Sequence, residues 1–253
     1  MVPGEPVAPG DLLIPRVLHQ TWKTADVPAV FHEYRASWRR HHPAWSVRLW
    51  TDADNRRLVA DHYPWFLERY DAYRYPIQRA DAARYFILHR HGGLYVDLDF
   101  ECLRSVEPLL APGKCTLGME PAGHARAFGR ERILCNAFMA APPEHPFTEA
   151  VLHALPGSAN AVPIHDRAFI LETTGPFLLT RVFERFEKRE AVAVLDSRLI
   201  YPLTMQEADV LRGVPLADVE AASAMPDAEA LRRRLTGAYA VHYHVGTWWR
   251  PRP

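Results

Sequence analysis

Two aspartates, Asp97 and Asp99, stand one residue apart in the run HRHGGLYVDLDF. Apolar residues alternate with Tyr95 and these aspartates, so a strand here would turn both carboxylates to one face and bury the other. Two carboxylates in this arrangement can share a hard divalent cation, and Mg²⁺ or Mn²⁺ bound in this way typically completes its coordination with substrate phosphates. The pair therefore predicts a metal site on the polar face of a strand.

A solvated face of an edge strand is the alternative for such a pair, but the preceding residues favour a binding site. Gly92 and Gly93 suit the left-handed end of a helix predicted over residues 76–91. Asp81 and Arg84 lie three residues apart on that helix and are neighbours on its surface. Arg84 could contact sugar or phosphate oxygens through two hydrogen bonds, and Asp81 could accept from sugar hydroxyls. A simple surface ion pair is the alternative for these two residues.

A second group of candidate residues lies in the terminal run YAVHYHVGTWW. His242 and His244 would project to the same side of a strand, where a histidine could complete the coordination of a metal. Thr247 and Trp248 follow them, and an indole N–H is a suitable donor to a phosphate oxygen. A docked terminal strand with core tryptophans is the alternative. Trp22, near the first strand, could stack on a nucleobase or belong to the core.

Strands and helices that could position these residues alternate along the chain, which predicts an α/β fold with a mixed, mostly parallel central sheet flanked by helices. Strand-like runs cover residues 14–22, 45–52, 94–100, 115–120, 133–141, the start of 191–203, and 238–249. Helical patterns cover residues 28–43, 56–69, 76–91, 145–155 and 176–188. A polar loop is expected at residues 51–55, and residues 206–234 are weakly specified.

Length and composition favour one soluble domain over residues 1–253, with a loose arm at 1–12 and a tail at 250–253. Basic and acidic residues balance at 30 each, so no overall field would attract nucleic acid. The three cysteines form no C-x-x-C pair and are expected to be reduced, which predicts a cytoplasmic protein. Apolar runs are too short for a signal peptide or an integral membrane span, while peripheral membrane contact stays open.

The chain resembles the family 32 glycosyltransferases, which are DXD-containing sugar transferases related to yeast initiating mannosyltransferases and capsular polysaccharide enzymes. Six runs match in the same order: IPRVLHQTWK, VRLWTD, RADAARYFILHRHGGLYVDLDFECLRSVEPLL, NAFMAAPPEHPF, TTGP and YAVHYHVGTWW. The central run is also similar to the catalytic domain of the large clostridial glucosylating toxins. This resemblance implies a GT-A fold, a UDP- or GDP-linked sugar donor, Mn²⁺ or Mg²⁺ as cofactor, and transfer with retention of anomeric configuration.

The resemblance also implies which residues bind the nucleotide. In HQTWK, Trp22 would stack on the base beside Thr21. Asp52, which ends the run VRLWTD, would lie near the nucleoside. Tyr95 would pack near the ribose or the sugar.

The same resemblance assigns the sugar and metal contacts. Asp81 and Arg84 would hold the transferred sugar, and Asn136 would face it. Asp99 would be the direct metal ligand, whereas Asp97 would contact the ribose and the sugar and reach the metal through water.

At the end of the chain, family members commonly carry two adjacent histidines, whereas here a tyrosine separates His242 from His244. His244 is favoured as the metal-facing histidine because it lies closer to the loop containing Thr247 and Trp248, which would close over the diphosphate. The TTGP run, with Thr174 and Gly175, would lie near the acceptor.

The predicted reaction moves a hexose-type sugar to an acceptor hydroxyl, which attacks on the face that the diphosphate leaves. The acceptor could be a glycan, a lipid-linked glycan, a small molecule or a protein. Glu101 and Asp166 are unsupported as covalent nucleophiles. A non-catalytic carbohydrate- or nucleotide-sugar-binding protein is the main alternative. A DxD phosphatase fits less well because Glu101 stands where that class has threonine or valine, and P-loop and dinucleotide motifs are absent.

Overall fold

The computed structural model describes residues 14–156, 166–213 and 227–246. The predicted arm (1–12), the predicted tail (250–253), Thr247 and Trp248 all lie outside the described residues.

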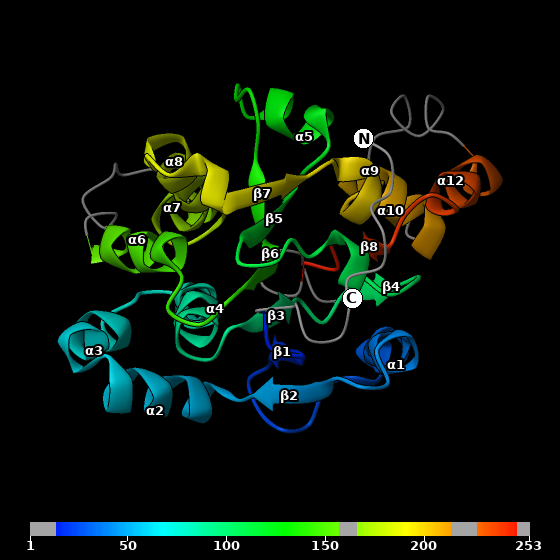
Figure 1. Cartoon of the computed structure of the whole chain (residues 1–253). Coiled ribbons are helices and arrows are strands. Elements are labelled where there is room, and N and C mark those ends of the chain that lie inside the picture. The colour runs from blue at the N-terminus through cyan, green and yellow to red at the C-terminus, as the bar shows by residue number, and fades with distance from the viewer. Residues whose placement is uncertain (1–13, 157–165, 214–226, 247–253) are drawn as a thin grey trace.

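A six-stranded sheet forms the centre of the fold, in the order β2–β1–β3–β6–β5–β7 (Figure 1). Strand β6 is antiparallel to both of its neighbours, and the other pairings are parallel. The prediction of a mixed, mostly parallel sheet is therefore confirmed. The strands of this sheet are β1 Val17–Thr21, β2 Ser46–Trp50, β3 Gly93–Val96, β5 Cys115–Met119, β6 Leu134–Ala141 and β7 Val192–Leu195.

A small second sheet joins the middle of the chain to its end. Strand β4 (Phe100–Cys102) pairs antiparallel with β8 (Ala240–His242). Because β4 follows β3 after only three residues, the second sheet adjoins the edge of the first where the two aspartates lie.

Helices cover both faces of the central sheet (Figure 1). One apolar cluster packs α2, α3, α4, α6 and α8 against the sheet, and another packs α1, α9 and the small sheet against the opposite face. The α-helices are α1 His32–His41, α2 Asp52–His62, α3 Pro64–Asp71, α4 Pro76–His91, α5 Ala122–Ala127, α6 Pro146–Ala154, α7 Asp166–Thr173, α8 Pro176–Arg185, α9 Ser197–Ile200, α10 Met205–Arg212 and α12 Ala228–Leu235. Short 3₁₀ helices are η1 Ala29–Phe31, η2 Glu107–Leu109 and η4 Arg189–Ala191.

The expected strand over residues 94–100 is wrong in one respect, because β3 ends at Val96. Leu94 and Val96 pack into one apolar cluster and Tyr95 into the other, so neither face of β3 meets solvent. A charged residue cannot continue a strand that is buried on both faces unless it finds partners. The chain instead turns, and the Phe100 N–H donates to the Asp97 carbonyl over 3.2 Å.

Helix capping and proline geometry explain two further differences from the prediction, both in the segment that follows β2. The loop expected at residues 51–55 is the start of α2, because Thr51 and Asp54 form a reciprocal capping box. The single helix expected over residues 56–69 is two helices, since Pro64 begins α3 and cannot continue the helix before it.

Differences near the end of the chain concern the weakly specified region and the last strand. The region expected to be weakly specified contains α10 and α12. The last strand ends at His242, and His244 has a left-handed φ of 47°.

The helix over residues 76–91 and the parallel pairing of β1 with β2 are as predicted.

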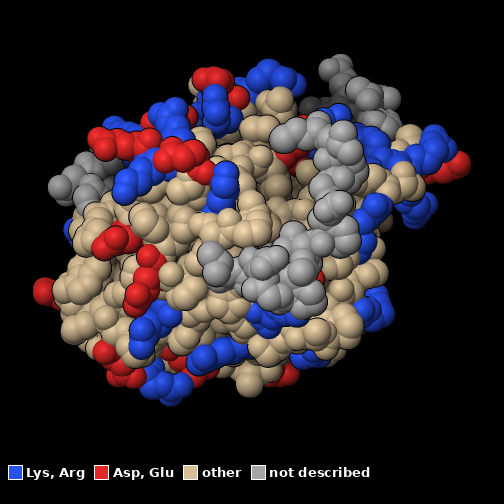
Figure 2. Space-filling view, in the orientation of Figure 1, with Lys and Arg blue, Asp and Glu red and all other residues tan. Residues whose placement is uncertain are grey.

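On the face shown in Figure 2, basic and acidic side chains are interspersed, in keeping with their equal numbers in the sequence. Among the helices of the described residues, none is both long enough and apolar enough to cross a membrane.

A glycine pair sets where the motif lies relative to the sheet. Gly92 and Gly93 have φ values of 62° and 93°, which side chains other than glycine rarely adopt. A Cβ on Gly93 would stand 2.5 Å from the carbonyl oxygen of Val17 on β1. These glycines let the chain leave α4 and pair with β1 without an intervening loop. Asp97, four residues after Gly93, therefore lies directly after the end of β3.

We expect Gly93→Ala to lower the free energy of unfolding by about 1–3 kcal/mol, through backbone strain and the clash with β1. Urea unfolding would measure the change. Gly237→Ala is the matched control, because this exposed glycine has an ordinary φ and no described atom within 4 Å of an added Cβ. Equal midpoints for the two variants would contradict this account of the glycine pair.

Candidate active site

Asp99 is held in place by the residues that end the described chain. His242 Nε2 lies 3.0 Å from Asp99 Oδ1, and the Val245 N–H donates to Asp99 Oδ2 over 2.8 Å. The Tyr243 N–H donates to the Asp99 carbonyl over 3.0 Å. Residues more than 140 positions apart thus fix this carboxylate.

Asp97, Asp99 and His242 form a group of possible metal ligands whose ligand atoms all lie within 4.8 Å of one another. The His242 ring is stacked on Phe100, with centroids 4.7 Å apart, and its buried Nδ1 has no hydrogen-bond partner in the described part of the chain. Carboxylate oxygens with one imidazole suit Mn²⁺ or Mg²⁺, so the donor set fits the predicted cofactor.

The structure brings His242 into this group, whereas the sequence had favoured His244. The two rings are close, with centroids 4.0 Å apart. His242 is the last residue of β8 and pairs with Phe100 on β4. This pairing brings its ring next to Asp99. His244 itself has a left-handed φ, and its ring packs edge-on against His124, with centroids 5.3 Å apart.

A second cluster joins α4, β3 and β6 around the guanidinium of Arg84, whose side chain is 4% exposed. Arg84 Nη2 lies 2.9 Å from Asp81 Oδ1, and Nη1 lies 3.2 Å from Asp97 Oδ1. Nη1 also donates to the Asn136 carbonyl over 2.9 Å, and Asn136 Nδ2 donates to Asp81 Oδ1 over 3.0 Å. The structure therefore brings together the four residues predicted to contact the sugar.

Burial and charge oppose each other in this cluster. Burial raises the pKa of Asp81 to about 6, although Arg84 lowers it. Burial also raises the pKa of Asp97, against the opposing effect of Arg84. For Arg84 itself, burial would lower the pKa, but Asp97, Tyr95 and Asp81 outweigh it and hold the pKa well above its usual value. Arg84 is therefore charged and balances the two carboxylates.

The other aspartate of the motif behaves differently. Burial would raise the pKa of Asp99, but the charge and hydrogen bond of His242 outweigh it and leave the pKa below its usual value. Burial would likewise lower the pKa of His242, whereas Asp99 raises it. Asp99 and His242 thus stabilise each other's charged forms, and a metal bound there would supply the positive charge beside Asp99.

Tyr95 and Thr21 are linked to Asp97 through hydrogen bonds. Tyr95 is fully buried, and its hydroxyl donates to Asp97 Oδ1 over 2.8 Å and lies 3.0 Å from Thr21 Oγ1. The hydroxyl of Tyr95 is thus used within the protein to orient Asp97, and the place of this residue near the ribose or sugar stays a prediction.

The residues predicted to bind the nucleoside gather at the ends of β1 and β2. Trp22 is half-buried, and its ring lies edge-on to Phe31 with centroids 5.5 Å apart, in an apolar cluster that also contains Leu98 of the motif. Asp52 is exposed at the first position of α2, and its N–H donates to the Lys23 carbonyl over 3.3 Å. This arrangement places Asp52 beside the residue that follows Trp22.

A partner of Asp81 lies far from it in the sequence. Thr174 Oγ1 is 3.2 Å from Asp81 Oδ2, so the TTGP turn, expected near the acceptor, packs against α4. The turn itself was recognisable from its glycine and proline. Its neighbour, 93 residues away, was not.

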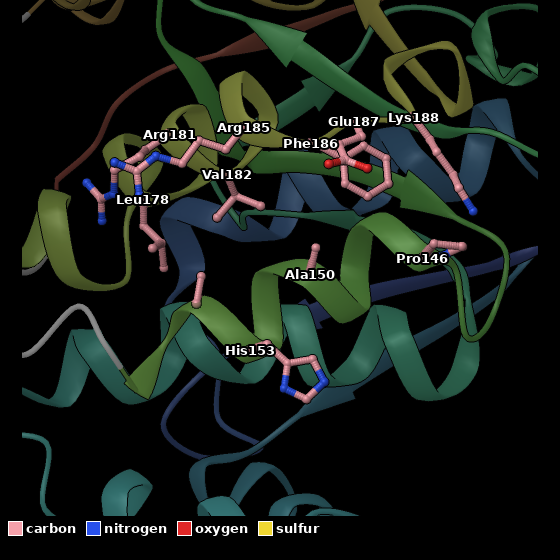
Figure 3. Close-up of a pocket in the computed structure, with 11 residues that line it drawn as sticks. Pro146, Ala150, His153, Leu178, Arg181, Val182, Arg185, Phe186, Glu187 and Lys188 are labelled. Atoms are coloured by element: carbon pink, nitrogen blue, oxygen red, sulfur yellow. The ribbon is translucent and has the colours of Figure 1, made fainter.

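One surface pocket of the described residues lies apart from the predicted site. Helices α6 and α8 enclose a trough of about 860 Å³, with Ala150, Leu178, Val182 and Phe186 along it and Lys188 at one end (Figure 3). None of the described site residues lines it.

The mixed sheet, the acidic turn after β3 and the small sheet that covers it define the GT-A class of glycosyltransferase folds. The solved structure of PaToxG glycosyltransferase shares this fold, with a TM-score of 0.52 and 14% sequence identity, covering 68% of this chain and 69% of that one. Residues 28–115 match the family described as "Glycosyltransferase sugar-binding region containing DXD motif". The chain belongs to this family, the family 32 glycosyltransferases.

Named relatives include two yeast enzymes. Inositol phosphoceramide mannosyltransferase 2 of Schizosaccharomyces pombe is 34% identical over 188 residues, which are 74% of this chain and 50% of that protein. Mannosyl phosphorylinositol ceramide synthase SUR1 of Saccharomyces cerevisiae is 36% identical over 180 residues, which are 71% of this chain and 44% of that protein. The chain thus spans about half the length of these relatives.

We expect Arg84→Gln to destabilise the fold by about 3–5 kcal/mol, because the buried Asp81 and the half-buried Asp97 lose the charge that balances them. Thermal and urea unfolding would measure the loss. Arg56→Gln is the control, since Arg56 pairs with Asp71 on the surface and its removal should barely change the melting temperature. Similar losses for the two variants would show that Arg84 does not balance buried charge.

Proposed function

We propose that the protein transfers a hexose-type sugar from a nucleotide-sugar donor to an acceptor hydroxyl, with a divalent metal held by Asp97, Asp99 and His242. The observation that carries this proposal is the convergence of these three ligands beside the cluster of Asp81 and Arg84. One part of the site offers oxygens and an imidazole to a cation, and the adjacent part offers charged hydrogen-bonding groups to a sugar. A nucleotide sugar requires both.

The cation would supply positive charge that stabilises the diphosphate as the glycosidic bond breaks. Around it, the chain's own residues bind and orient the donor. Trp22, at the ends of β1 and β2, would hold the base, and Asp81 and Asn136 would accept from and donate to sugar hydroxyls. Arg84 favours the ionised forms of Asp81 and Asp97 and helps to fix the direction of both carboxylates.

We further propose that transfer proceeds with retention, the acceptor attacking on the face that the diphosphate leaves. Glu101 does not support a covalent alternative, because its carboxylate accepts a 2.7 Å hydrogen bond from the Tyr243 hydroxyl. The side chain of Asp166 lies outside the described residues. The hydrogen bond of Glu101 therefore supports retention without a covalent protein intermediate.

The relatives suggest which donor and acceptor to test first. Two of them are named as mannosyltransferases or synthases of mannosylated inositol phosphoceramides. We propose mannose as the sugar and a hydroxyl of an inositol-containing glycolipid as the acceptor. Glycans, other small molecules and proteins are the acceptors to test next.

A thermal-shift series tests the proposal directly. GDP-mannose, UDP-glucose and UDP-galactose would each be added with and without Mn²⁺, and release of the nucleoside diphosphate would then be followed. We expect one donor to raise the melting temperature only with metal and to be turned over. If no donor shifts the melting temperature even with metal, the donor site is wrong. A shift without turnover would favour a non-catalytic binding protein.

We expect Asp99→Asn to reduce metal-dependent turnover by roughly 100-fold or more, because it removes the predicted direct ligand. The variant should still fold, since an amide can replace the carboxylate in shape. Asp61→Asn, on the exposed side of α2, is the control and should match the unaltered protein. Retained metal-dependent activity in Asp99→Asn would contradict the ligand assignment.

A further inference from the structure

The turn between α7 and α8 is tied to the sugar-facing side of α4 by three side chains. Gln78 Nε2 donates to Thr173 Oγ1 over 2.9 Å, and the Tyr85 hydroxyl donates to the Thr174 carbonyl over 2.9 Å. Between these anchors, Thr174 Oγ1 lies 3.2 Å from Asp81 Oδ2. Residues 78, 81 and 85 are three and four positions apart and share one face of the helix, so the turn is fastened on both sides of Asp81.

The two oxygens of Asp81 have different partners. Oδ1 accepts from Arg84 and Asn136, as described above. In the described part of the chain, the donor to Oδ2 is the hydroxyl of Thr174, which is itself fully buried. Without Thr174, this oxygen would lose its contact, and the carboxylate could rotate about its last torsion, which is soft.

The Thr174 hydroxyl has one proton and two acceptors within reach. The carbonyl of Ile170 is 3.4 Å away, compared with 3.2 Å for Asp81 Oδ2. An ionised carboxylate is the stronger acceptor, and it is also the nearer one. The turn is held in place by its backbone bonds and by Gln78 and Tyr85, so the hydroxyl need not maintain the turn.

We propose that Thr174 is a positioning residue that fixes the direction in which Asp81 presents its carboxylate to the donor sugar. This inference rests on the proposed transferase function and deepens it. The TTGP turn then acts through Asp81 and not by contact with the acceptor. Its glycine fits this role, because a Cβ on Gly175 would stand 3.0 Å from the Cα of Leu171 and push the turn off α7.

Thr174→Val and Thr174→Ser would test the inference. Valine keeps the branched shape but removes the hydroxyl, whereas serine keeps the hydroxyl. We expect kcat for Thr174→Val to fall about 10- to 100-fold, because a small misdirection of a sugar contact lowers the rate by factors of this size. The Kd of the nucleoside diphosphate with Mn²⁺ should stay within about twofold, and serine should restore most of kcat.

Thr148→Val is the matched control, because it removes another buried threonine hydroxyl whose partner is the backbone of His145. It should leave kcat unchanged whatever it costs in stability. An unchanged kcat in Thr174→Val, a failure of serine to restore it, or an equal loss in Thr148→Val would each overturn the inference.

A crystal structure of Thr174→Val gives a readout that does not depend on turnover. We expect the Asp81 carboxylate to rotate away from its present direction while the turn stays in place. An unrotated carboxylate would overturn the inference, even if the protein transferred no sugar. Absence of turnover in the unaltered protein would instead count against the proposed function, so the two failures are distinguishable.

Discussion

The guanidinium of Arg84 is buried between two carboxylates, Asp81 and Asp97, where α4, β3 and β6 meet. Such a charge cannot be left without partners in a core of low polarity, nor can the carboxylates be left without it. The helix, the strand and the returning strand are therefore held in one relative position by a single ion cluster. The other groups of the site are attached to this cluster: Tyr95 to Asp97, and Asn136 and Thr174 to Asp81.

The proposed metal-binding part of the site depends on a different constraint, which is the pairing of β4 with β8. This pairing carries His242 to Asp99 and brings the Val245 N–H to the other carboxylate oxygen. The end of the described chain thus completes a site that begins at β1. The large and the small sheet meet at the three-residue turn that contains both aspartates. The large sheet fixes Asp97 through β6, and the small sheet fixes Asp99 through β8.

The sequence predicted those parts of the site that depend on local spacing. The helix over residues 76–91, its glycine end and the neighbouring positions of Asp81 and Arg84 all follow from periodicity within 18 residues. The aspartate pair was recognisable for the same reason, although its surroundings were not. A strand buried on both faces and one with a solvated face can share the same alternation, so the turn after Val96 could not be foreseen.

Contacts between distant residues could not be predicted from one sequence. Whether His242 or His244 faces Asp99 depends on where β8 ends, and the partner of Thr174 depends on how α7 and α8 pack on α4. That the Tyr95 hydroxyl orients Asp97 could not be predicted either, because residue type does not reveal which partner a hydroxyl finds inside the protein. The spacing of apolar residues predicts individual helices and strands, whereas the packing of these elements decides which of their ends lie together.

The central claim is that the turn after β3 and the end of β8 together hold a divalent metal that binds the donor's diphosphate. Anomalous diffraction from crystals grown with Mn²⁺ and GDP or UDP tests it most directly. The account predicts one manganese peak bonded to Asp99, adjoining Asp97 and His242 and touching the diphosphate. A nucleotide bound with manganese elsewhere, or with no manganese at this turn, would contradict it.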